Sequence, residues 1–338
     1  MRLFVSGEAP LEAEGTTVAL MMEERYDDLA DLRERAKAEV AKVVIGQDRT
    51  VELFLIAAVA HGHVLIEGPP GSAKTLLARA IAHMLGASFK RIQFTPDTTP
   101  AELNGVNAIR AGEHVFLPGA VFTNVLLADE INRTPPRTQA ALLEAMQERQ
   151  VTVEGKGHRL KDPFLVIATQ NPYEHEGIFR LPESQLDRFL FKMELDYADA
   201  DSELDMLDLP HKGVAPDMLG EIKPLLGVVG LERARYELNS TILPMEIGRY
   251  IVALGRRTRE LPGVELGASS RSLIHLASAA KAIARLDGRD AVAIEDVHEI
   301  APYVLRHRLI VEPGLDPDDV LHEAFETVPV PDAELAMV

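Results

Sequence analysis

The chain has 338 residues and a formal net charge of −18 at pH 7, and hydrophobic and charged residues make up 46% and 26% of it. These proportions are typical of a globular chain with two domains or one large one. The absence of cysteine excludes disulfides, thiolate zinc sites and thiol nucleophiles, and it is compatible with a cytoplasmic protein. The acidic balance argues against nucleic acid as the main partner, because Lys and Arg contacts to phosphate supply most of the affinity in such complexes.

The sequence predicts neither a membrane-spanning segment nor a secretory signal. No run of about 18 apolar residues is present, so the sequence predicts no membrane-spanning helix. Residues 1–24 show no clear periodicity and are expected to form a mobile tail without the apolar segment of a secretory signal. Strands and helices then alternate over residues 25–197, which predicts an α/β domain.

An apolar turn precedes the first strand of this domain. It contains Ile45 and Gly46 and lies between a charged helix at Leu29–Val40 and an apolar helix at Val51–Ala60. Such a turn can form a wall for an adenine ring, or it can simply connect two helices. The sequence favours neither interpretation.

The most informative stretch begins with the apolar run Val64–Ile66, which is typical of a buried strand, and ends with a helix at Leu76–Leu85. The small-residue loop between them forms a phosphate site, because loop N–H groups and the helix dipole point at the anion. The ammonium of Lys74 reaches the outer phosphates, and the hydroxyl of Thr75 can ligate Mg²⁺. The usual pattern has a second glycine where this chain has Ala73. The expected nucleotide contacts are Gly68, Pro69, Pro70, Gly71, Ser72, Ala73, Lys74, Thr75 and Leu76.

A short strand is expected at Phe89–Phe94 and a loop at Thr95–Glu102, followed by an unusual segment, Leu103–Phe122. Its length and its three glycines predict a helix interrupted by a small hairpin. Phe116 and Phe122 within it are interpreted either as core residues or as part of an exposed loop.

A second decisive strand is the continuous apolar run at 125–128, which ends in Asp129 and Glu130. Such runs are typical of central parallel strands, and ligands bind at the carboxyl ends of these strands. Asp129 is expected to hold Mg²⁺ through water, and Glu130 to orient and polarise the attacking water.

Two further segments bring polar residues toward the same edge. The alternating residues of Val151–Leu160 predict a hairpin, and Phe164–Thr169 predicts another apolar strand. Asn171, just beyond this strand, is expected to contact the γ-phosphate or the water, although it can also be a simple turn former before Pro172.

A short helix over residues 183–188 leads into a last strand at Phe189–Leu195. Arg188, between the two, is either a surface residue or a group that reaches a neighbouring subunit's phosphate. Arg180 and Arg133 are alternatives for that role.

From residue 198 the alternation of strands and helices stops, which predicts a helical domain over 198–315 that begins with an acidic, Pro- and Gly-containing linker. Helices are expected at Met245–Arg259, Ser272–Leu286 and Ile294–Arg308, followed by an acidic C-terminal tail at 316–338. Arg271 lies at a helix start, where its positive charge opposes the macrodipole, and this hints at a ligand role.

Together these motifs resemble the AAA+ ATPases and, among them, the MoxR group. Gly68–Thr75 resembles the Walker A loop, in an alanine variant that this group itself often carries, and Leu126–Glu130 resembles Walker B. Residues 103–122 are similar to the helix-2 insert, and residues 151–160 to the pre-sensor-1 hairpin. The resemblance covers residues 40–310 approximately.

The same resemblance extends to single polar residues. Asn171 resembles sensor 1, Arg188 the arginine finger and Arg271 the sensor 2 arginine. The family usually has proline where this chain has Ser270, which makes the exact start of that helix less defined.

The resemblance implies a P-loop AAA+ core with a parallel sheet and a helix-2 insert, followed by a smaller all-α lid domain. It also implies an ATPase that uses Mg²⁺ and assembles as a homo-oligomeric ring, expected to be hexameric, with ATP between subunits and Arg188 acting in trans. The group consists of chaperone-like ATPases that work with von Willebrand factor A domain partners and mature target complexes or insert metal into them. The implied catalytic residues are Lys74, Glu130, Asn171 and Arg188, the further nucleotide contacts are Ile45, Gly46, Asp129 and Arg271, and the metal-binding residues are Thr75 and Asp129.

Two other functions are considered beside an ATP-driven remodelling enzyme. The first is a DNA-associated AAA+ motor, against which the acidic balance and the few basic residues of the 151–160 hairpin argue. The second is a nucleotide-gated binding module with little turnover, which only Ala73 favours.

Overall fold

The computed structural model describes residues 29–110, 113–172, 178–208, 211–212, 215–216 and 219–331. The expected tail at 1–24 therefore lies outside the described residues. In the described part of the chain, no helix is long and apolar enough to cross a membrane.

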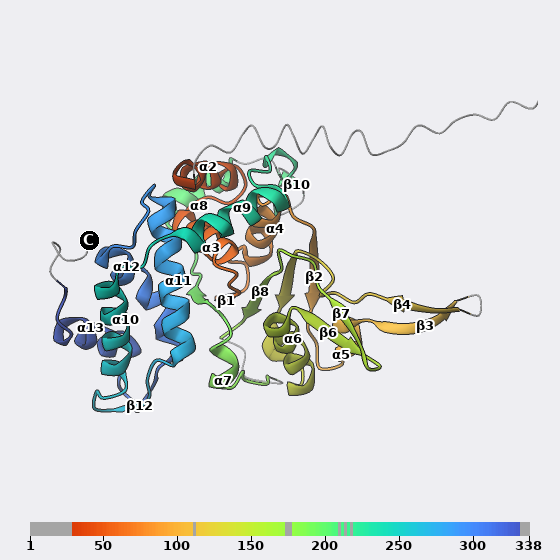
Figure 1. Cartoon of the computed structure of the whole chain (residues 1–338). Coiled ribbons are helices and arrows are strands. Elements are labelled where there is room, and N and C mark those ends of the chain that lie inside the picture. Colours follow the sequence, from red (N-terminus) through yellow and green to blue (C-terminus); the bar gives the residue numbers. More distant parts are fainter. Residues whose placement is uncertain are drawn as a thin grey trace, which may run out of the picture.

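A parallel five-stranded sheet forms the centre of the N-terminal domain, with the strand order β2-β5-β8-β1-β9 (Figure 1). Its strands are β1 (Val64–Glu67), β2 (Phe89–Gln93), β5 (Val125–Asp129), β8 (Leu165–Gln170) and β9 (Phe191–Glu194). Gln93 pairs with Asp129, and Glu67 with Gln170, so the carboxyl ends of neighbouring strands meet at one edge. The phosphate loop follows β1 at that edge.

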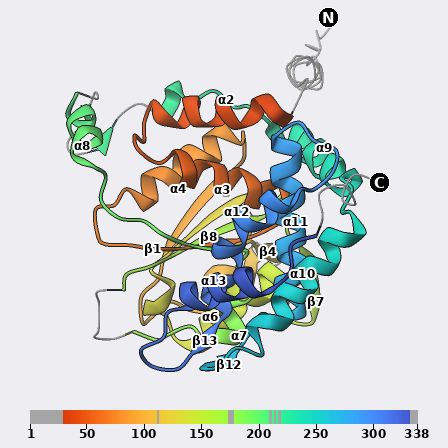
Figure 2. The same ribbon diagram turned by 90° about the vertical axis from the view of Figure 1, so that its left-hand side faces the viewer.

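Alternation along the central strands fills two hydrophobic layers. Leu127 and Ile167 belong to the same buried cluster as residues of α3 and α4, whereas Leu126 and Val166 belong to a cluster with residues of α6. The helices of this domain are α2 (Leu29–Ala41), α3 (Asp48–Val59), α4 (Lys74–Met84), α5 (Pro100–Asn104), α6 (Pro136–Glu148), α7 (Glu183–Leu186) and α8 (Ala200–Leu207). Figure 1 and Figure 2 show α2, α3 and α4 on one side of the sheet and α6 on the other.

Two antiparallel hairpins extend from the sheet edge beyond β2 (Figure 1). They are β3 (Val106–Arg110) with β4 (Glu113–Leu117), and β6 (Gln150–Val153) with β7 (Lys156–Arg159). The Phe116 ring stacks on His158 with 3.8 Å between ring centroids, and it meets Phe122 edge-on at 5.3 Å. The hairpin expected within 103–122 is confirmed, but the helix before it is only the short α5, which begins inside the expected loop.

The second domain is a bundle of helices connected by short segments. Its helices are α9 (Gly227–Ser240), α10 (Met245–Thr258), α11 (Ser270–Leu286), α12 (Ile294–Leu305) and α13 (Pro317–Thr327), and it also contains the short strand pair β12 (Val264–Leu266) and β13 (Ile310–Val311). In the sequence before α9, a second short strand pair is formed by β10 (His211–Lys212) and β11 (Ala215–Pro216). Ser269 caps α11 by accepting a hydrogen bond from the N–H of Ser272, and the Ser272 hydroxyl in turn lies 3.0 Å from the N–H of Ser269. This mutual capping fixes the helix start, so that Arg271 lies in the first turn.

The expected tail at 316–338 is wrong in its first half. Asp316 caps α13, Pro317 occupies its first turn, and Val320, Leu321 and Ala324 are buried in the main hydrophobic cluster. Residues 317–327 are therefore part of the helical domain. The expected helices at 245–259, 272–286 and 294–308 are present with shifts of a few residues.

Candidate functional site

The phosphate loop has the close packing that requires a small residue. A Cβ placed on Gly68 would lie 2.3 Å from the carbonyl oxygen of Leu195, so no side chain fits there. Ala73, at the position of the expected second glycine, has a φ of +58°. This left-handed conformation explains why glycine is the usual residue there, and why alanine is the least demanding replacement.

Lys74 at the start of α4 points back into the loop. Its Nζ donates to the carbonyl oxygens of Gly68 at 2.9 Å and Pro69 at 2.6 Å. Burial lowers the pKa of Lys74, and the charges of Asp129 and Glu130 oppose that shift. The two carbonyl oxygens thus hold the ammonium group at the loop, and the oxygens of an incoming phosphate can replace them as its hydrogen-bond acceptors.

Asp129, at the end of β5, has both carboxylate oxygens engaged. Oδ1 accepts from Thr169 Oγ1 at 2.6 Å, and Oδ2 accepts from Arg91 Nε at 3.1 Å and from its terminal nitrogen at 2.7 Å. The Asp129 side chain is largely buried, and the Arg91 side chain is 43% exposed. A divalent cation that approaches Asp129 would therefore compete with Arg91 for Oδ2.

Glu130 follows with a φ of +59° and turns its side chain into the same region. Thr169 Oγ1 accepts from its backbone N–H at 2.9 Å, so one threonine orients both acidic residues. The Oε2 atom of Glu130 lies 3.0 Å from Arg133 Nε and 3.4 Å from Gln93 Nε2. The two carboxylates are thus fixed by neighbouring strands before any ligand enters.

These groups line one cavity of about 400 Å³, here called the P-loop cavity. Its described lining residues are Pro70, Gly71, Ser72, Ala73, Lys74, Thr75, Leu76, Arg91, Gln93, Asp129, Glu130, Thr169, Gln170 and Asn171. The expected loop residues, the acidic pair and Asn171 are brought together here, while Gly68 and Pro69 lie behind the surface and contact it through Lys74. Sequence reasoning missed Arg91, Gln93 and Thr169; the first two alternate along β2 toward the same side as Asp129, which is the signal that was available.

Ile45 and Gly46 are not among the residues that line this cavity. They form the turn between α2 and α3, where Gly46 has a φ of +75° and a Cβ on it would lie 2.9 Å from Ser202 Oγ of α8. The hydroxyl of Tyr197, just before α8, donates to the Pro70 carbonyl oxygen at 3.3 Å. The turn and α8 therefore pack together next to the phosphate loop, and the adenine role of the turn stays a prediction.

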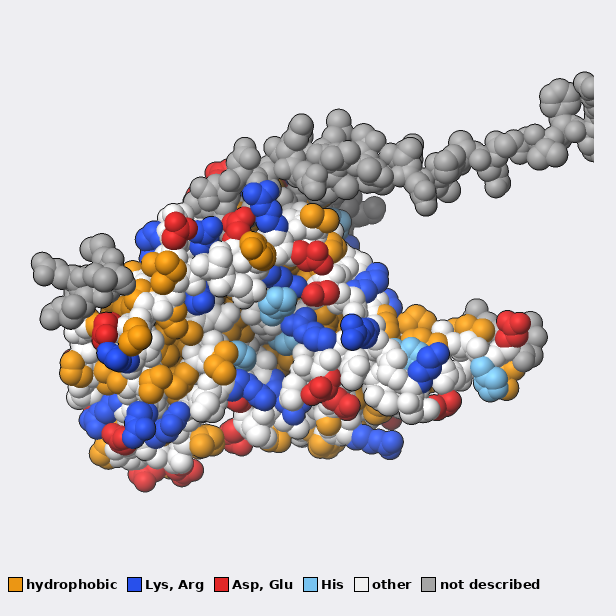
Figure 3. All heavy atoms as spheres, in the orientation of Figure 1, with side chains coloured by type: hydrophobic (Ala, Val, Ile, Leu, Met, Phe, Trp, Pro, Cys, Tyr) orange, Lys and Arg blue, Asp and Glu red, His pale blue; other side chains and the backbone are white. Residues whose placement is uncertain are grey.

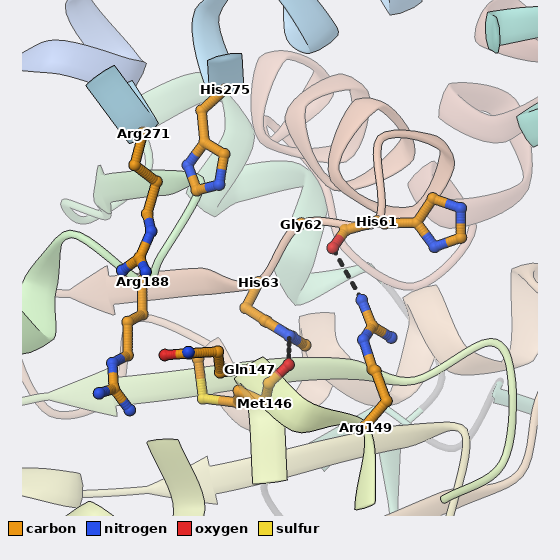
Figure 4. Close-up of a pocket in the computed structure, with 9 residues that line it drawn as sticks. All are labelled: His61, Gly62, His63, Met146, Gln147, Arg149, Arg188, Arg271 and His275. Carbon is orange, nitrogen blue, oxygen red and sulfur yellow. Dashed lines mark hydrogen bonds between the residues drawn. The ribbon is translucent and has the colours of Figure 1, made fainter. Parts of the chain in front are cut away.

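A second cavity, of about 220 Å³, lies where the two domains meet and is here called the arginine pocket. Its lining residues are His61, Gly62, His63, Met146, Gln147, Arg149, Arg188, Arg271 and His275 (Figure 4). Figure 4 shows Arg271 descending from α11 toward Arg188, and Figure 3 shows Lys, Arg and His side chains gathered in the middle of this face of the molecule. Arg271 is thus placed with Arg188, and it does not line the P-loop cavity of its own chain.

The histidines of this pocket add no charge at neutral pH. Burial lowers the pKa of His63 and His275 to about 3, and with Arg235 and Arg149 nearby it lowers that of His61 to about 4. Arg149 donates to the carbonyl oxygens of Phe164 at 2.7 Å and His61 at 2.9 Å. The pocket is therefore cationic through its arginines alone.

The oxygen donors of the P-loop cavity suit a magnesium nucleotide. Thr75 and Asp129 line the same cavity, and Mg²⁺ prefers one or two protein oxygens together with phosphate and water. No group of three or more metal-ligating side chains occurs in the described part of the chain. The residues present thus fit a metal that arrives with the phosphates.

Comparisons with known proteins agree with this geometry. A family model described as "ATPase family associated with various cellular activities (AAA)" matches residues 63–191, and an AAA lid domain model matches residues 256–324. Chaperone MoxR1 of Mycobacterium tuberculosis is 40% identical over 314 residues, which cover 88% of this chain and 82% of that protein.

The chain belongs to the MoxR family of AAA+ ATPases.

Two further relatives match over nearly the whole length. The uncharacterized protein YeaC of Bacillus subtilis is 42% identical over 90% of this chain and 97% of its own length. A solved structure from Cytophaga hutchinsonii that carries an ATPase assignment is 34% identical, has a TM-score of 0.83, and covers 94% of this chain and 99% of its own. The α/β core and the helical lid of this MoxR-family chain are thus shared by its relatives.

Proposed function

We propose that this MoxR-family protein hydrolyses ATP with Mg²⁺ at sites shared between neighbouring subunits of a ring, which we expect to be a hexamer. The observation that carries the proposal is the separation of the two cavities. The P-loop cavity is lined by Lys74, Asp129, Glu130 and Asn171. Arg188 and Arg271 line the arginine pocket of the same chain instead. A neighbouring subunit can supply those arginines to an ATP bound at the P-loop.

In the proposed reaction each residue of the P-loop cavity has a separate role. Lys74 releases the loop carbonyls and neutralises the outer phosphates, and Glu130 accepts a hydrogen bond from the attacking water and polarises it. Asn171 orients the water or the γ-phosphate. Thr75 and Asp129 would hold Mg²⁺ together with the phosphates, and the bound ion would neutralise part of the developing charge.

We assign the trans contribution to Arg188 together with Arg271. Arg133 is the weaker alternative, because its Nε lies 3.0 Å from Glu130 Oε2 of its own chain and serves the acidic pair there. Arg180 is exposed in the segment before α7 and lies outside the arginine pocket. Arg188 by contrast has a buried Nε that has no hydrogen-bond partner among the described residues, and an incoming phosphate oxygen would satisfy it.

The energy of hydrolysis would serve chaperone-like remodelling, maturation or metal insertion in a partner complex. The name of the relative MoxR1, a chaperone, supports this, and we expect a von Willebrand factor A domain protein as the partner. The net charge of −18 supports a protein partner over DNA, and with it a prediction that DNA does not stimulate turnover.

Mixed assemblies test the shared site. Arg188→Ala subunits keep an intact P-loop cavity, and Glu130→Gln subunits keep an intact arginine pocket, so neither alone should turn over. A mixture should regain activity at interfaces that pair the two intact halves. Size measurement establishes that mixed assemblies form, and no recovery at any ratio in such assemblies would contradict the shared site.

A further inference from the structure

Asp187, directly before Arg188, connects the core to the lid through one carboxylate. The Ser269 hydroxyl lies 3.3 Å from each of its oxygens, and the Ser272 hydroxyl lies 3.3 Å from Oδ1. Arg271 and Arg308 approach the same group, at 3.7 Å from Oδ2 and 3.2 Å from Oδ1. Four lid side chains thus converge on one core residue.

The buried positive charge of Arg308 depends on the carboxylate of Asp187. Its side chain is only 2% exposed, and within the described residues Asp187 is its sole carboxylate partner within 4.0 Å. Burial lowers the pKa of Arg308 to about 10, which the charge of Asp187 opposes and that of Arg271 reinforces. Its terminal nitrogen also donates to the carbonyl oxygens of Phe189 at 2.5 Å and Asp187 at 3.3 Å. The lid is therefore hydrogen-bonded to the backbone on both sides of Arg188.

The backbone around Arg188 transmits this hold over a short distance. Three consecutive backbone N–H groups donate to carbonyl oxygens of α7. These bonds run from Asp187 to Glu183 at 3.1 Å, from Arg188 to Gln185 at 3.2 Å and from Phe189 to Leu186 at 3.0 Å. This closed turn leaves Arg188 little freedom apart from its own side-chain rotations. A displacement of the Asp187 carboxylate would therefore move the start of the Arg188 side chain with it.

We propose that Asp187 is a positioning residue that fastens Arg188 and Arg271 into one unit, which a subunit presents to its neighbour's nucleotide. The proposal rests on the proposed function, in which both arginines act in trans. Asp187 itself does not touch the nucleotide. It offsets part of the mutual repulsion of Arg188, Arg271 and Arg308 and sets where the first two point. A change in lid position then reaches the neighbour's site directly through this carboxylate.

Asp187→Asn in the full chain tests the proposal, since asparagine keeps the shape and removes the charge. We expect kcat for ATP to fall about 10- to 100-fold, as for a misplaced catalytic group, with KM within about twofold of the wild-type value. Asp187→Glu should recover part of the loss, because it restores the carboxylate. The matched control is Asp318→Asn, which removes another Asp–Arg pair of the lid, 2.6 Å from Arg306, and should leave kcat unchanged.

Mixing separates positioning in trans from a general structural effect. Asp187→Asn subunits combined with Glu130→Gln subunits should regain turnover, because the latter present a correctly held Arg188 to the intact P-loop of the former. A loss of kcat that mixing does not restore, or a wild-type kcat in Asp187→Asn, would overturn the proposal. If Arg188→Ala with Glu130→Gln also shows no recovery, the shared site itself has failed.

A milder variant covers the case in which Asp187→Asn does not fold. Ser269→Ala with Ser272→Ala leaves the ion pair of Asp187 and Arg308 in place and removes the two hydroxyl contacts together with the mutual cap of α11. Asp316→Ala, which removes the cap of α13, is the control for the loss of a lid cap. The kcat of the double serine variant should fall several-fold, with the same recovery on mixing. An unchanged kcat in this folded variant, when Asp187→Asn cannot be measured, would overturn the proposal.

Discussion

The P-loop cavity and the arginine pocket differ in how their charges are balanced. In the P-loop cavity Lys74 faces Asp129 and Glu130, and each acid also has an arginine from the same chain. The arginine pocket is lined by three arginines and three histidines and, in the part of the chain that the structure describes, by no acidic side chain, and Asp187 pairs with Arg271 at its border. The first cavity is thus self-contained, whereas the second keeps an excess of positive charge, of which Asp187 offsets only a part. This difference is what a site divided between two subunits requires.

Arg188→Ala should have the largest effect on the side of the arginine pocket. An arginine that stabilises transition-state charge is worth about 10³–10⁵ in rate, so kcat should fall by about 10³-fold or more while nucleotide binding stays unchanged. Steady-state turnover and fluorescent-nucleotide titration measure the two quantities. Arg180→Ala is the control, and a loss in Arg180→Ala equal to that in Arg188→Ala would show that the finger is assigned wrongly.

Glu130→Gln tests the self-contained side. Removal of a group that polarises the attacking water should lower kcat about 10²–10⁴-fold, and it should leave ATP bound in the P-loop cavity. Isolated protein should then retain ATP instead of ADP, as chromatography of the released nucleotide shows. Glu148→Gln on the surface of α6 is the control. Wild-type turnover in Glu130→Gln would remove Glu130 from the reaction.

Arg91→Ala sharpens the comparison by removing one internal countercharge. Arg91 competes with a cation for Asp129 Oδ2, and a hydrogen bond between charged groups is worth about 1.5–3 kcal/mol. The Arg91 side chain is 43% exposed, so the lower end of this range applies, and half-maximal nucleotide binding should need about tenfold less Mg²⁺. Lys90→Ala is a suitable control, because Lys90 alternates to the other face of β2 and donates to the Gly119 carbonyl at 3.0 Å. An unchanged or increased Mg²⁺ requirement would contradict competition.

His63→Gln has the smallest expected effect, and it concerns stability. The Val166 N–H donates to His63 Nδ1 at 3.0 Å, and the Nε2 atom lies 3.3 Å from the Met146 carbonyl, so the buried ring is neutral. Burial lowers its pKa from 6.5 to about 3. The unfolded chain thus binds the extra proton, and stability that is complete above pH 6.5 is lost as the pH falls toward 3.

The measurement for His63 is the free energy of unfolding in urea between pH 7 and pH 4. One such histidine contributes a slope of about 1.4 kcal/mol per pH unit at most, and His63→Gln should lower the slope by about that amount. His322→Gln, on the exposed side of α13, should leave the slope unchanged. An identical slope in His63→Gln and the wild type would show that His63 does not take up a proton on unfolding.

The sequence predicted the P-loop cavity better than the arginine pocket for a physical reason. The phosphate loop is contiguous, and Asp129 and Glu130 follow a strand whose burial is visible in its composition. Their meeting follows from the parallel register of a sheet. The position of Arg271 next to Arg188 depends instead on how the lid packs on the core. No local pattern encodes that packing, so the sequence predicted a nucleotide contact for Arg271 but not its place beside Arg188.

Other differences were readable but were overlooked. Asp316 and Pro317 are a helix start, and Val320, Leu321 and Ala324 share one helical face, yet the acidic composition of 316–338 suggested a tail. Thr169 was missed for another reason. Its role depends on two hydrogen bonds to a neighbouring strand, which become visible only when β5 and β8 are placed side by side.

The most direct test of the shared site is the specific ATPase activity as a function of protein concentration, with particle size measured by light scattering in the presence and absence of ATP and Mg²⁺. A site completed by a neighbour predicts that activity per subunit rises with concentration together with the fraction of ring-sized particles. Activity that is constant down to concentrations at which the protein is monomeric would contradict it.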